Sequence, residues 1–552
     1  MRKLIFLVIA AALGNLPALA AHESAAEKRP NFLIIVADDL GFSDIGAFGG
    51  EIATPNLDRL ALQGVRLTDF HTAPTCSPTR AMLLTGADHH VAGLGTMAEL
   101  QAPNQRGLPG YEGYLRRDVA TIAERLAPQG YRTLFSGKWH LGLTDDQDPF
   151  ARGFQYSFAL RPGAHNHFGV DLTNPLTGAP NYSENGKALS SLPQDFYSSD
   201  AFAERLIGQL RNSTSTDQEK KPFFGILAFT APHWPLQAPP EDIARYRGEY
   251  DAGFEALRQR RIARQEELGL IGKGINANPP KLPGGSWDEL SADQQAVAIR
   301  DMEIYAAMVH RLDQAIGKVL DELERTGEFD NTVIIFMSDN GAEGLDPEGS
   351  AKALLAPILA LADNRLDNRG AASSYVLYGP GWAQAATAPR WLIKGYATDG
   401  GTRVPAFVHW PASARRGEVA ATLLHVSDIV PTVLDLAGVS HEALAPSAEL
   451  AWQPITGRSW AEWLQGLTPS VRSNGDALGV ELFGSRALRQ GEWKITDIGD
   501  GQWRLFHLAG DPGETRDLAA TNPAKLAELA QLWDEYAKTN NVVIPTEARY
   551  RP

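Results

Sequence analysis

Short, almost uninterrupted apolar runs that end in polar or acidic residues are the clearest pattern along the chain. The first run covers residues 31–37, the second residues 223–229 and the third residues 333–337. Runs of this length are typical of strands that are buried on both faces of a parallel sheet. Between them lie segments with helical character, such as 119–126 and 301–323. This alternation predicts an α/β fold with a large central, mostly parallel mixed sheet flanked by helices.

The pattern changes after about residue 470. Short strand-like segments are followed there by one helical segment, at residues 478–483, 493–498, 503–508 and 523–538. We therefore predict a large domain over residues 29–470 and a smaller C-terminal α+β domain over residues 471–552.

The first twenty residues have the features of a secretory signal peptide. Arg2 and Lys3 precede an apolar stretch over residues 4–13, which is too short to span a bilayer. Small residues before Ala21 suit a cleavage site between Ala20 and Ala21. We expect a periplasmic or secreted protein; the alternative is an uncleaved membrane anchor. Because no later stretch is long and apolar enough to cross a membrane, we expect no stable membrane anchor.

Composition narrows the functional classes. The formal net charge of the 552 residues is −15, which argues against a nucleic-acid partner, because nucleic acid demands a basic surface. Cys76 is the only cysteine, so the chain has no internal disulfide. A lone cysteine is most often a small buried apolar residue. Cys76, however, begins the turn-like sequence Cys76-Ser77-Pro78-Thr79-Arg80.

Acidic and amide side chains directly follow two of the predicted buried strands. Asp38 and Asp39 follow the first run, and Asp339 and Asn340 follow the run that ends at residue 337. Ligands bind outside the carboxyl ends of the strands in sheets of this kind. Oxygen ligands suit a hard cation such as Ca²⁺ or Mg²⁺, and their spacing does not choose between the two. Either pair by itself is more often a helix cap or an Asx turn.

Basic residues and histidines gather in three other segments. Lys138 and His140 are two positions apart, so in an extended chain they would share a face. His233 follows the apolar run at 223–229, and Lys394 precedes a glycine-rich segment. Considered singly, each residue is more often a solvated lysine or a histidine with a hydrogen bond in the core.

These motifs together resemble the sulfatase family. The resemblance rests on the Cys76-x-Pro78-x-Arg80 motif with its Leu84-Thr85-Gly86 tail, and on the block at residues 130–140. Residues 379–382 look especially like bacterial arylsulfatases. The resemblance implies an alkaline-phosphatase-like fold, a catalytic role for residues 29–470, and an arylsulfatase that converts an aryl sulfate and water to a phenol and sulfate.

The resemblance also implies a nucleophile and a metal. In that family the cysteine is converted to formylglycine, whose hydrate attacks sulfur, so Cys76 would be the modified residue. Asp38, Asp39, Asp339 and Asn340, together with the modified Cys76, would hold one ion, which the resemblance indicates is Ca²⁺. The implied partners are a small sulfate ester and a formylglycine-generating or equivalent maturation enzyme.

By the same resemblance, the basic residues and histidines would act on the sulfate group and the leaving oxygen. Arg80 would hold the formylglycine oxygen, since a guanidinium suits an oxyanion. Lys138 and Lys394 would bind sulfate oxygens, and His233 would protonate the leaving oxygen. His140 would serve as the base when the intermediate breaks down.

Two other functions remain open, and so does the choice of substrate. A phosphonate or phosphate ester hydrolase of the same superfamily would share the cysteine motif, although we find no ligand set for a second metal. A binding protein for sulfated ligands is the other alternative. Specificity would lie on loops 161–170 and 343–390, with Trp382 or His167 at the pocket entrance.

Overall fold

The computed structural model describes residues 29–172, 181–212, 221–277, 285–346, 349, 352–441 and 452–547. The predicted signal peptide lies outside these residues. Among the helices they form, none is both long and apolar enough to cross a membrane.

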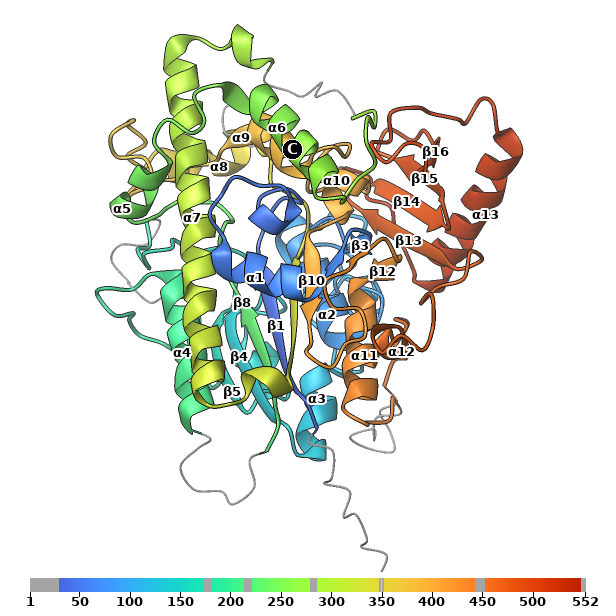
Figure 1. Ribbon diagram of the computed structural model, residues 1–552, viewed down its shortest axis with the longest axis horizontal. Coiled ribbons are helices and arrows are strands. Elements are labelled where there is room, and N and C mark those ends of the chain that lie inside the picture. Colours follow the sequence, from blue (N-terminus) through green and yellow to red (C-terminus); the bar gives the residue numbers. More distant parts are fainter. Residues whose placement is uncertain are drawn as a thin grey trace, which may run out of the picture.

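A ten-stranded sheet forms the centre of the molecule (Figure 1). Its strand order is β11 (Val419–Ala420), β2 (Val65–Leu67), β10 (Ala406–His409), β9 (Thr332–Ser338), β1 (Asn31–Ala37), β8 (Phe223–Ala228), β4 (Arg132–Lys138), β5 (Tyr156–Leu160), β6 (Tyr182–Glu184) and β7 (Lys187–Ala188). The five strands from β9 to β5 are parallel, whereas β10 and β6 pair with them in antiparallel orientation. The predicted mixed, mostly parallel sheet is therefore confirmed.

Side chains of the central strand β1 alternate between two apolar cores. Leu33 and Ile35 point into one core, and Ile34 and Val36 into the other. Because both faces are buried, β1 is apolar from Phe32 to Ala37 instead of alternating with polar residues.

Helices cover both faces of the sheet (Figure 1). The first core is closed by α1 (Pro55–Gln63), α4 (Ser198–Asn212), α6 (Gly253–Glu267), α7 (Ala292–Arg325) and α9 (Gly379–Thr387). The second core is closed by α2 (Cys76–Thr85), α3 (Ile122–Leu126), α11 (Ile429–Leu436) and α12 (Ala461–Leu464). The remaining short elements are β3 (Phe70–His71), α5 (Pro240–Ile243), α8 (Lys352–Leu359), α10 (Asp399–Thr402) and β12 (Leu424–His425).

A separate antiparallel sheet lies beside this body and carries one helix, drawn in red at the right of Figure 1. It contains β13 (Ala477–Leu482), β14 (Ser485–Gln490), β15 (Trp493–Asp497) and β16 (Arg504–His507), and α13 (Pro523–Thr539) packs on it. This arrangement confirms the predicted α+β character of the C-terminal part. The boundary between residues 470 and 471 stays a prediction.

Candidate active site

Four neighbouring strands bring the predicted site residues to one edge of the sheet. Strands β9, β1, β8 and β4 are adjacent and parallel, so their carboxyl ends meet. Asp339 follows β9, Asp38 follows β1 and Lys138 ends β4. His233 follows β8 after a short turn in which its amide donates to the carbonyl of Thr230 (3.0 Å). The strand order thus gathers residues that lie up to 301 positions apart in sequence.

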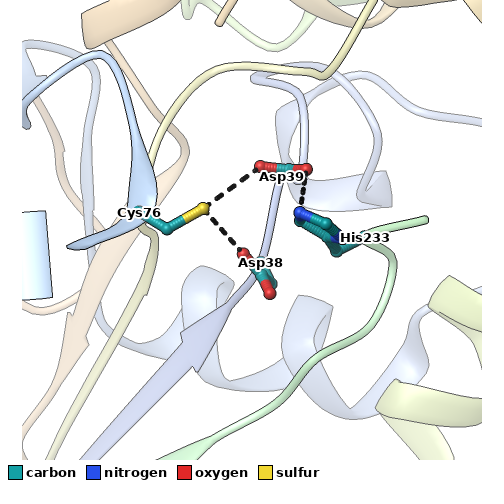
Figure 2. Close-up of side chains that lie close together, drawn as sticks. All are labelled: Asp38, Asp39, Cys76 and His233. Carbon is teal, nitrogen blue, oxygen red and sulfur yellow. Dashed lines mark hydrogen bonds and ion pairs between the residues drawn. The ribbon is translucent and has the colours of Figure 1, made fainter. Parts of the chain in front are cut away.

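Cys76 is the first residue of α2 and lies against the two acidic side chains that follow β1 (Figure 2). Its Sγ is 3.3 Å from Oδ1 of Asp38 and 3.8 Å from Oδ1 of Asp39. The cysteine is fully buried, as is every other residue of α2. Asp39 itself has a left-handed backbone, with φ at 67°, which turns its carboxylate toward the sulfur side of the site.

Arg80 lies one helical turn after Cys76 and faces the same cluster. Its Nε and Nη2 donate to Oδ2 of Asp339 at 3.0 and 2.8 Å, and its Nη1 donates to the carbonyl of Lys138 at 2.7 Å. Nη2 is also 3.7 Å from Oδ1 of Asp38. The guanidinium therefore ties α2 to the ends of β9 and β4 and lies where a fork of donors can meet an anion.

Two buried lysines supply the remaining positive charge. Lys138 Nζ donates to Oδ2 of Asp38 at 2.7 Å. Lys394 Nζ lies 2.8 Å from Oδ1 of Asp39 and 3.0 Å from Oε2 of Glu343. Glu343 was not predicted as a site residue; its place three residues after Asn340 was the only signal that could have indicated it.

The two predicted histidines take different positions. His233 Nε2 is 3.5 Å from Oδ2 of Asp39, so this imidazole belongs to the central cluster (Figure 2). His140 instead pairs through Nε2 with Oε1 of Glu99 at 3.0 Å. The expectation that Lys138 and His140 share the face of an extended strand is wrong. Strand β4 ends at Lys138 and His140 adopts a φ of 57°, which turns its side chain out of the strand alternation.

The cluster fits a divalent cation. One ligand atom from each of Asp38, Asp39, Cys76 and His233 lies within 4.8 Å of the others. The side-chain oxygen of Asn340 is buried and has no hydrogen-bond partner among the described residues, while its Nδ2 donates to Oδ1 of Asp39. An orphaned buried oxygen beside carboxylates is an environment that a hard cation would satisfy.

Burial and the neighbouring charges shift the acid–base properties of the site. Burial alone would raise the pKa of Asp39, but Lys394, His233 and Lys138 outweigh it and hold the pKa well below its usual range. Burial and then the negative charge of Asp38 raise the pKa of Asp339 to about 6. Burial, assisted by Asp339, raises the pKa of the Cys76 thiol well above its usual value. The unmodified thiol is therefore protonated at neutral pH and is a poor nucleophile.

The predicted entrance residues are not at an entrance. Trp382 is buried on α9, where its ring packs against Phe254, Tyr250 and Trp287 and its Nε1 donates to the carbonyl of Ala298. His167 is also buried, and its Nε2 bonds to the carbonyl of His233 (3.0 Å). Of the two, only His167 contacts a site residue, through the backbone of His233.

Three comparisons place the chain among known proteins. The family model described as Sulfatase matches residues 30–439. A Schizosaccharomyces pombe protein that is named an uncharacterized sulfatase is 45% identical over 96% of this chain and 97% of its own length. An arylsulfatase of Klebsiella aerogenes is 38% identical over 81% of this chain and 94% of its own.

Solved structures share the fold at lower identity. Ps i-CgsB, solved in complex with k-i-k-neocarrahexaose, superposes with a TM-score of 0.65 at 24% identity and covers 95% of both chains. BT4656, solved in complex with its substrate D-glucosamine-2-N,6-O-disulfate, has a TM-score of 0.61 at 21% identity. It covers 94% of this chain and 99% of its own.

Proposed function

Because the chain belongs to the sulfatase family, we propose that it is an arylsulfatase that uses a formylglycine made from Cys76 and one bound Ca²⁺. The family makes it a sulfuric ester hydrolase, and the name of the Klebsiella relative supports aryl esters as substrates. The observation that carries the proposal is the position of Cys76, whose Sγ lies 3.3 and 3.8 Å from two carboxylates that could share a metal with it.

The charge of the buried cluster suits a sulfate ester. The carboxylates of Asp38, Asp39, Asp339 and Glu343 outnumber the cations of Arg80, Lys138 and Lys394 by one. A divalent ion turns that deficit into a single positive charge, which one sulfate monoester anion neutralises. A phosphate monoester dianion would leave the buried cluster with excess negative charge, which a site away from water tolerates poorly.

The site residues of this chain have different roles in the proposed reaction. Formylglycine at residue 76 would supply a hydroxyl nucleophile for sulfur. Asp38, Asp39, Asp339 and Asn340, together with residue 76, would hold the Ca²⁺, which would supply positive charge beside this nucleophile. Lys138 and Lys394 bind sulfate oxygens and stabilise the negative charge that develops on them. Arg80 holds the oxygen carried by residue 76 in place.

The two histidines transfer protons in the proposed reaction, one as a donor and the other as an acceptor. His233, beside Lys394 and Asp39, gives a proton to the departing phenol oxygen. Burial lowers the pKa of His233 well below its usual value, so the imidazole is neutral at neutral pH in the substrate-free site. The negative charge of the bound ester favours its protonated form, so His233 takes up the proton that it gives only when the ester is bound. His140, paired with Glu99, accepts the proton that must leave residue 76 before sulfate is released.

Mass spectrometry of the tryptic peptide that contains Cys76, combined with kinetics, tests the proposal. In protein from a host that matures sulfatases, we expect this peptide to be lighter by the exchange of sulfur for oxygen and to react with a carbonyl reagent. Cys76→Ala should lose aryl sulfatase activity, and a chelator should reduce it reversibly in the unaltered protein. Full activity with an unmodified thiol would overturn the mechanism.

The alternatives give different outcomes with matched substrates. A phosphonate or phosphate ester hydrolase would turn over 4-nitrophenyl phosphonate or phosphate esters faster than 4-nitrophenyl sulfate. A binding protein would bind these esters without turnover, even when residue 76 is formylglycine. We expect the sulfate ester to be preferred.

We also propose that the protein is exported, to the periplasm or beyond the cell, after cleavage near Ala20 and Ala21. A maturation enzyme would act on Cys76 during this process. N-terminal sequencing of protein recovered from the periplasm and the medium tests the cleavage site; an intact N-terminus in the membrane fraction would contradict it. We retain the division into domains at residues 470 and 471 as a proposal, which limited proteolysis would test.

A further inference from the structure

His167 is a buried histidine beside the candidate site, and the proposed reaction assigns it no role. It belongs to the loop that follows β5, and only 1% of its surface is exposed. Its Nε2 is 3.0 Å from the carbonyl oxygen of His233, and its Nδ1 is 2.8 Å from Oγ of Ser198 at the start of α4. The ring therefore joins two other segments of the chain to the turn that carries His233.

The partners of the His167 ring fix its tautomer. A carbonyl oxygen can only accept, so Nε2 must carry the proton that it donates to His233. Burial lowers the pKa of His167 to about 4, so the ring is neutral at neutral pH. Nδ1 is then an acceptor, and the hydroxyl of Ser198 donates to it. Thr230 in turn donates its hydroxyl to Oγ of Ser198 (3.2 Å).

The carbonyl that receives this hydrogen bond lies where the sheet no longer holds the backbone. The pairing of β8 with β1 and β4 ends at Ala228. Beyond that point, the amide of His233 donates to the carbonyl of Thr230 (3.0 Å), and the carbonyl of His233 accepts from His167. Loss of this donor would leave a buried carbonyl without a partner, which favours a shift of the turn.

The position of this turn decides where the proposed proton donor lies. Nδ1 of His233 is 2.5 Å from the carbonyl of Trp234 and therefore donates to it. Nε2 is left to carry the second proton of the imidazolium, and it is 3.5 Å from Oδ2 of Asp39 in the central cluster (Figure 2). Proton transfer requires hydrogen-bond reach, and a misplacement of about 1 Å can lower a rate by about 100-fold.

The backbone of His167 is itself held in place. Its amide donates to Oε1 of Gln237 (2.9 Å), and its carbonyl accepts from the amide of Ser198 (2.9 Å). Nε2 of Gln237 donates in turn to the carbonyl of Ser374 (2.9 Å), in the long region between β9 and α9. These residues are all buried. A side chain that orients another must be fixed in this way.

We propose that His167 is a positioning residue for His233: through the carbonyl of His233 it holds the imidazole where Nε2 can reach the leaving oxygen. The inference rests on the proposed function, because it requires His233 to act as the acid. It predicts a dependence on the leaving group. A phenolate that leaves readily without a proton needs this alignment little, whereas a phenolate that leaves poorly needs it strongly.

The test measures kcat/KM of the matured, full-length enzyme on 4-nitrophenyl, phenyl and 4-methoxyphenyl sulfate, whose phenolates are increasingly poor leaving groups. For His167→Leu, we expect a fall of less than about threefold with 4-nitrophenyl sulfate but of about 30-fold or more with 4-methoxyphenyl sulfate. His310→Leu is the matched control, since that ring is also buried and bonds to the carbonyl of Ala53 (2.9 Å). It should leave the ratio between the three esters unchanged.

Two milder variants keep the test decisive if His167→Leu folds poorly. The amide of glutamine can still donate to the carbonyl of His233, so His167→Gln should keep all three values within about threefold of the unaltered enzyme. Ser198→Ala removes the donor to Nδ1 and should lower kcat/KM for 4-methoxyphenyl sulfate by about threefold to tenfold.

A double-mutant cycle shows whether His167 acts through His233. In a His233→Ala background, adding His167→Leu should change kcat/KM by less than about twofold on any of the esters. Equal losses on the three esters, losses that persist in this background, or no loss in any variant would each overturn the inference. No turnover of any aryl sulfate by unaltered protein with confirmed formylglycine would instead overturn the proposed function.

Discussion

At the scale of single residues, the site is a set of buried charges that depend on one another. The carboxylate of Asp39 contacts Lys394, His233 and the side-chain amide of Asn340 at the same time. The carboxylate of Asp38 accepts hydrogen bonds from Lys138 and from the thiol of Cys76. Removing one partner leaves an uncompensated charge away from water, which is costly. If the proposed function holds, the cations have two roles, as ligands for an anionic substrate and as counter-ions in the folded protein.

Lys394→Met tests the catalytic part of this dual role. We expect kcat on 4-nitrophenyl sulfate to fall by at least about 100-fold, because one positive charge would be lost where negative charge develops. Lys187→Met, at an exposed position on β7, is the matched control and should leave kcat unchanged. A variant that is folded by circular dichroism yet retains more than a tenth of the activity would show that Lys394 is only structural.

At the scale of secondary structure, strand β4 shows how the backbone sets the site. Gly137 has a φ of 133°, and a Cβ there would lie 1.8 Å from the carbonyl oxygen of Ala228 on β8. Only glycine fits this conformation and this close approach. The position directly precedes Lys138, so the same backbone places the lysine among the acidic residues.

Gly137→Ala should therefore destabilise the protein by about 3 kcal/mol or more, measured by urea unfolding. The matched control is Gly208→Ala in α4, where an added Cβ meets no atom within 4 Å. Alanine is the better helix former, so this control should be neutral or more stable by up to about 1 kcal/mol. Similar effects at both glycines would contradict the explanation from strand geometry.

The sequence was sufficient to predict elements whose burial is uniform. Strand β1 was predicted at its observed limits, and α7 was predicted because its apolar residues recur at helical spacing. The left-handed backbone of Asp39 and His140 was not predictable, because neither residue is a glycine, the residue type that usually marks such a conformation. Trp382 was misplaced for a related reason, since a large aromatic residue in a glycine-rich segment gives no indication of which side it faces.

The same limit applies to the site. The motifs indicated which residues would meet, because strand ends in a parallel sheet share an edge. The partners Glu343, in an irregular segment, and Glu99, in a short 3-10 helix at Ala98–Leu100, were missed. Their contacts depend on loop paths, which hydrophobic periodicity does not describe.

At the scale of the whole molecule, the C-terminal sheet supports the segment that carries Lys394. Lys494 on β15 lies 2.6 Å from Asp399 and 2.8 Å from Glu514, and the amide of Asp399 donates to Glu514 (2.8 Å). The amide of Gly395 in turn donates to the carbonyl of Pro74, two residues before Cys76. A chain of direct contacts thus joins the small sheet to the reactive centre.

Lys494→Met should consequently lower the free energy of unfolding by about 3 kcal/mol, since it leaves Glu514 buried without this counter-ion and Asp399 with Arg403 alone at 3.3 Å. Lys525→Met removes a more exposed partner of Glu528 and should cost less than about 1 kcal/mol. Urea unfolding of both variants at one pH gives the comparison. Equal values would show that the buried ion pairs do not hold the sheet in place.

His90, which contacts Glu481 on β13, makes the stability of the folded protein depend on pH. Although burial lowers its pKa, hydrogen bonds and charges from Asp88 and Glu481 outweigh this and raise it to about 9; Tyr111 and Tyr536 also face the ring. The folded protein therefore holds a proton that the unfolded chain releases near pH 6.5. This stabilisation is complete below pH 6.5 and disappears as the pH rises through 9.

The unfolding midpoint in urea should decline between pH 6.5 and 9.5 more steeply for the unaltered protein than for His90→Gln. The difference between the two curves isolates His90 from other titrating groups. Parallel curves over this range would show that His90 does not carry the extra proton.

The burial of Cys76 imposes an order of events on biosynthesis. No part of its side chain is exposed in the folded protein, and the ends of β1 and β9 and the whole of α2 enclose it. Any enzyme that modifies this side chain would have to reach it while the chain is still unfolded, before β1 has paired with β9 about 300 residues later in the sequence. On the proposed function, the modification of Cys76 would have to precede the pairing of β9 with β1, so the relative rates of modification and folding would decide how much of the protein becomes active.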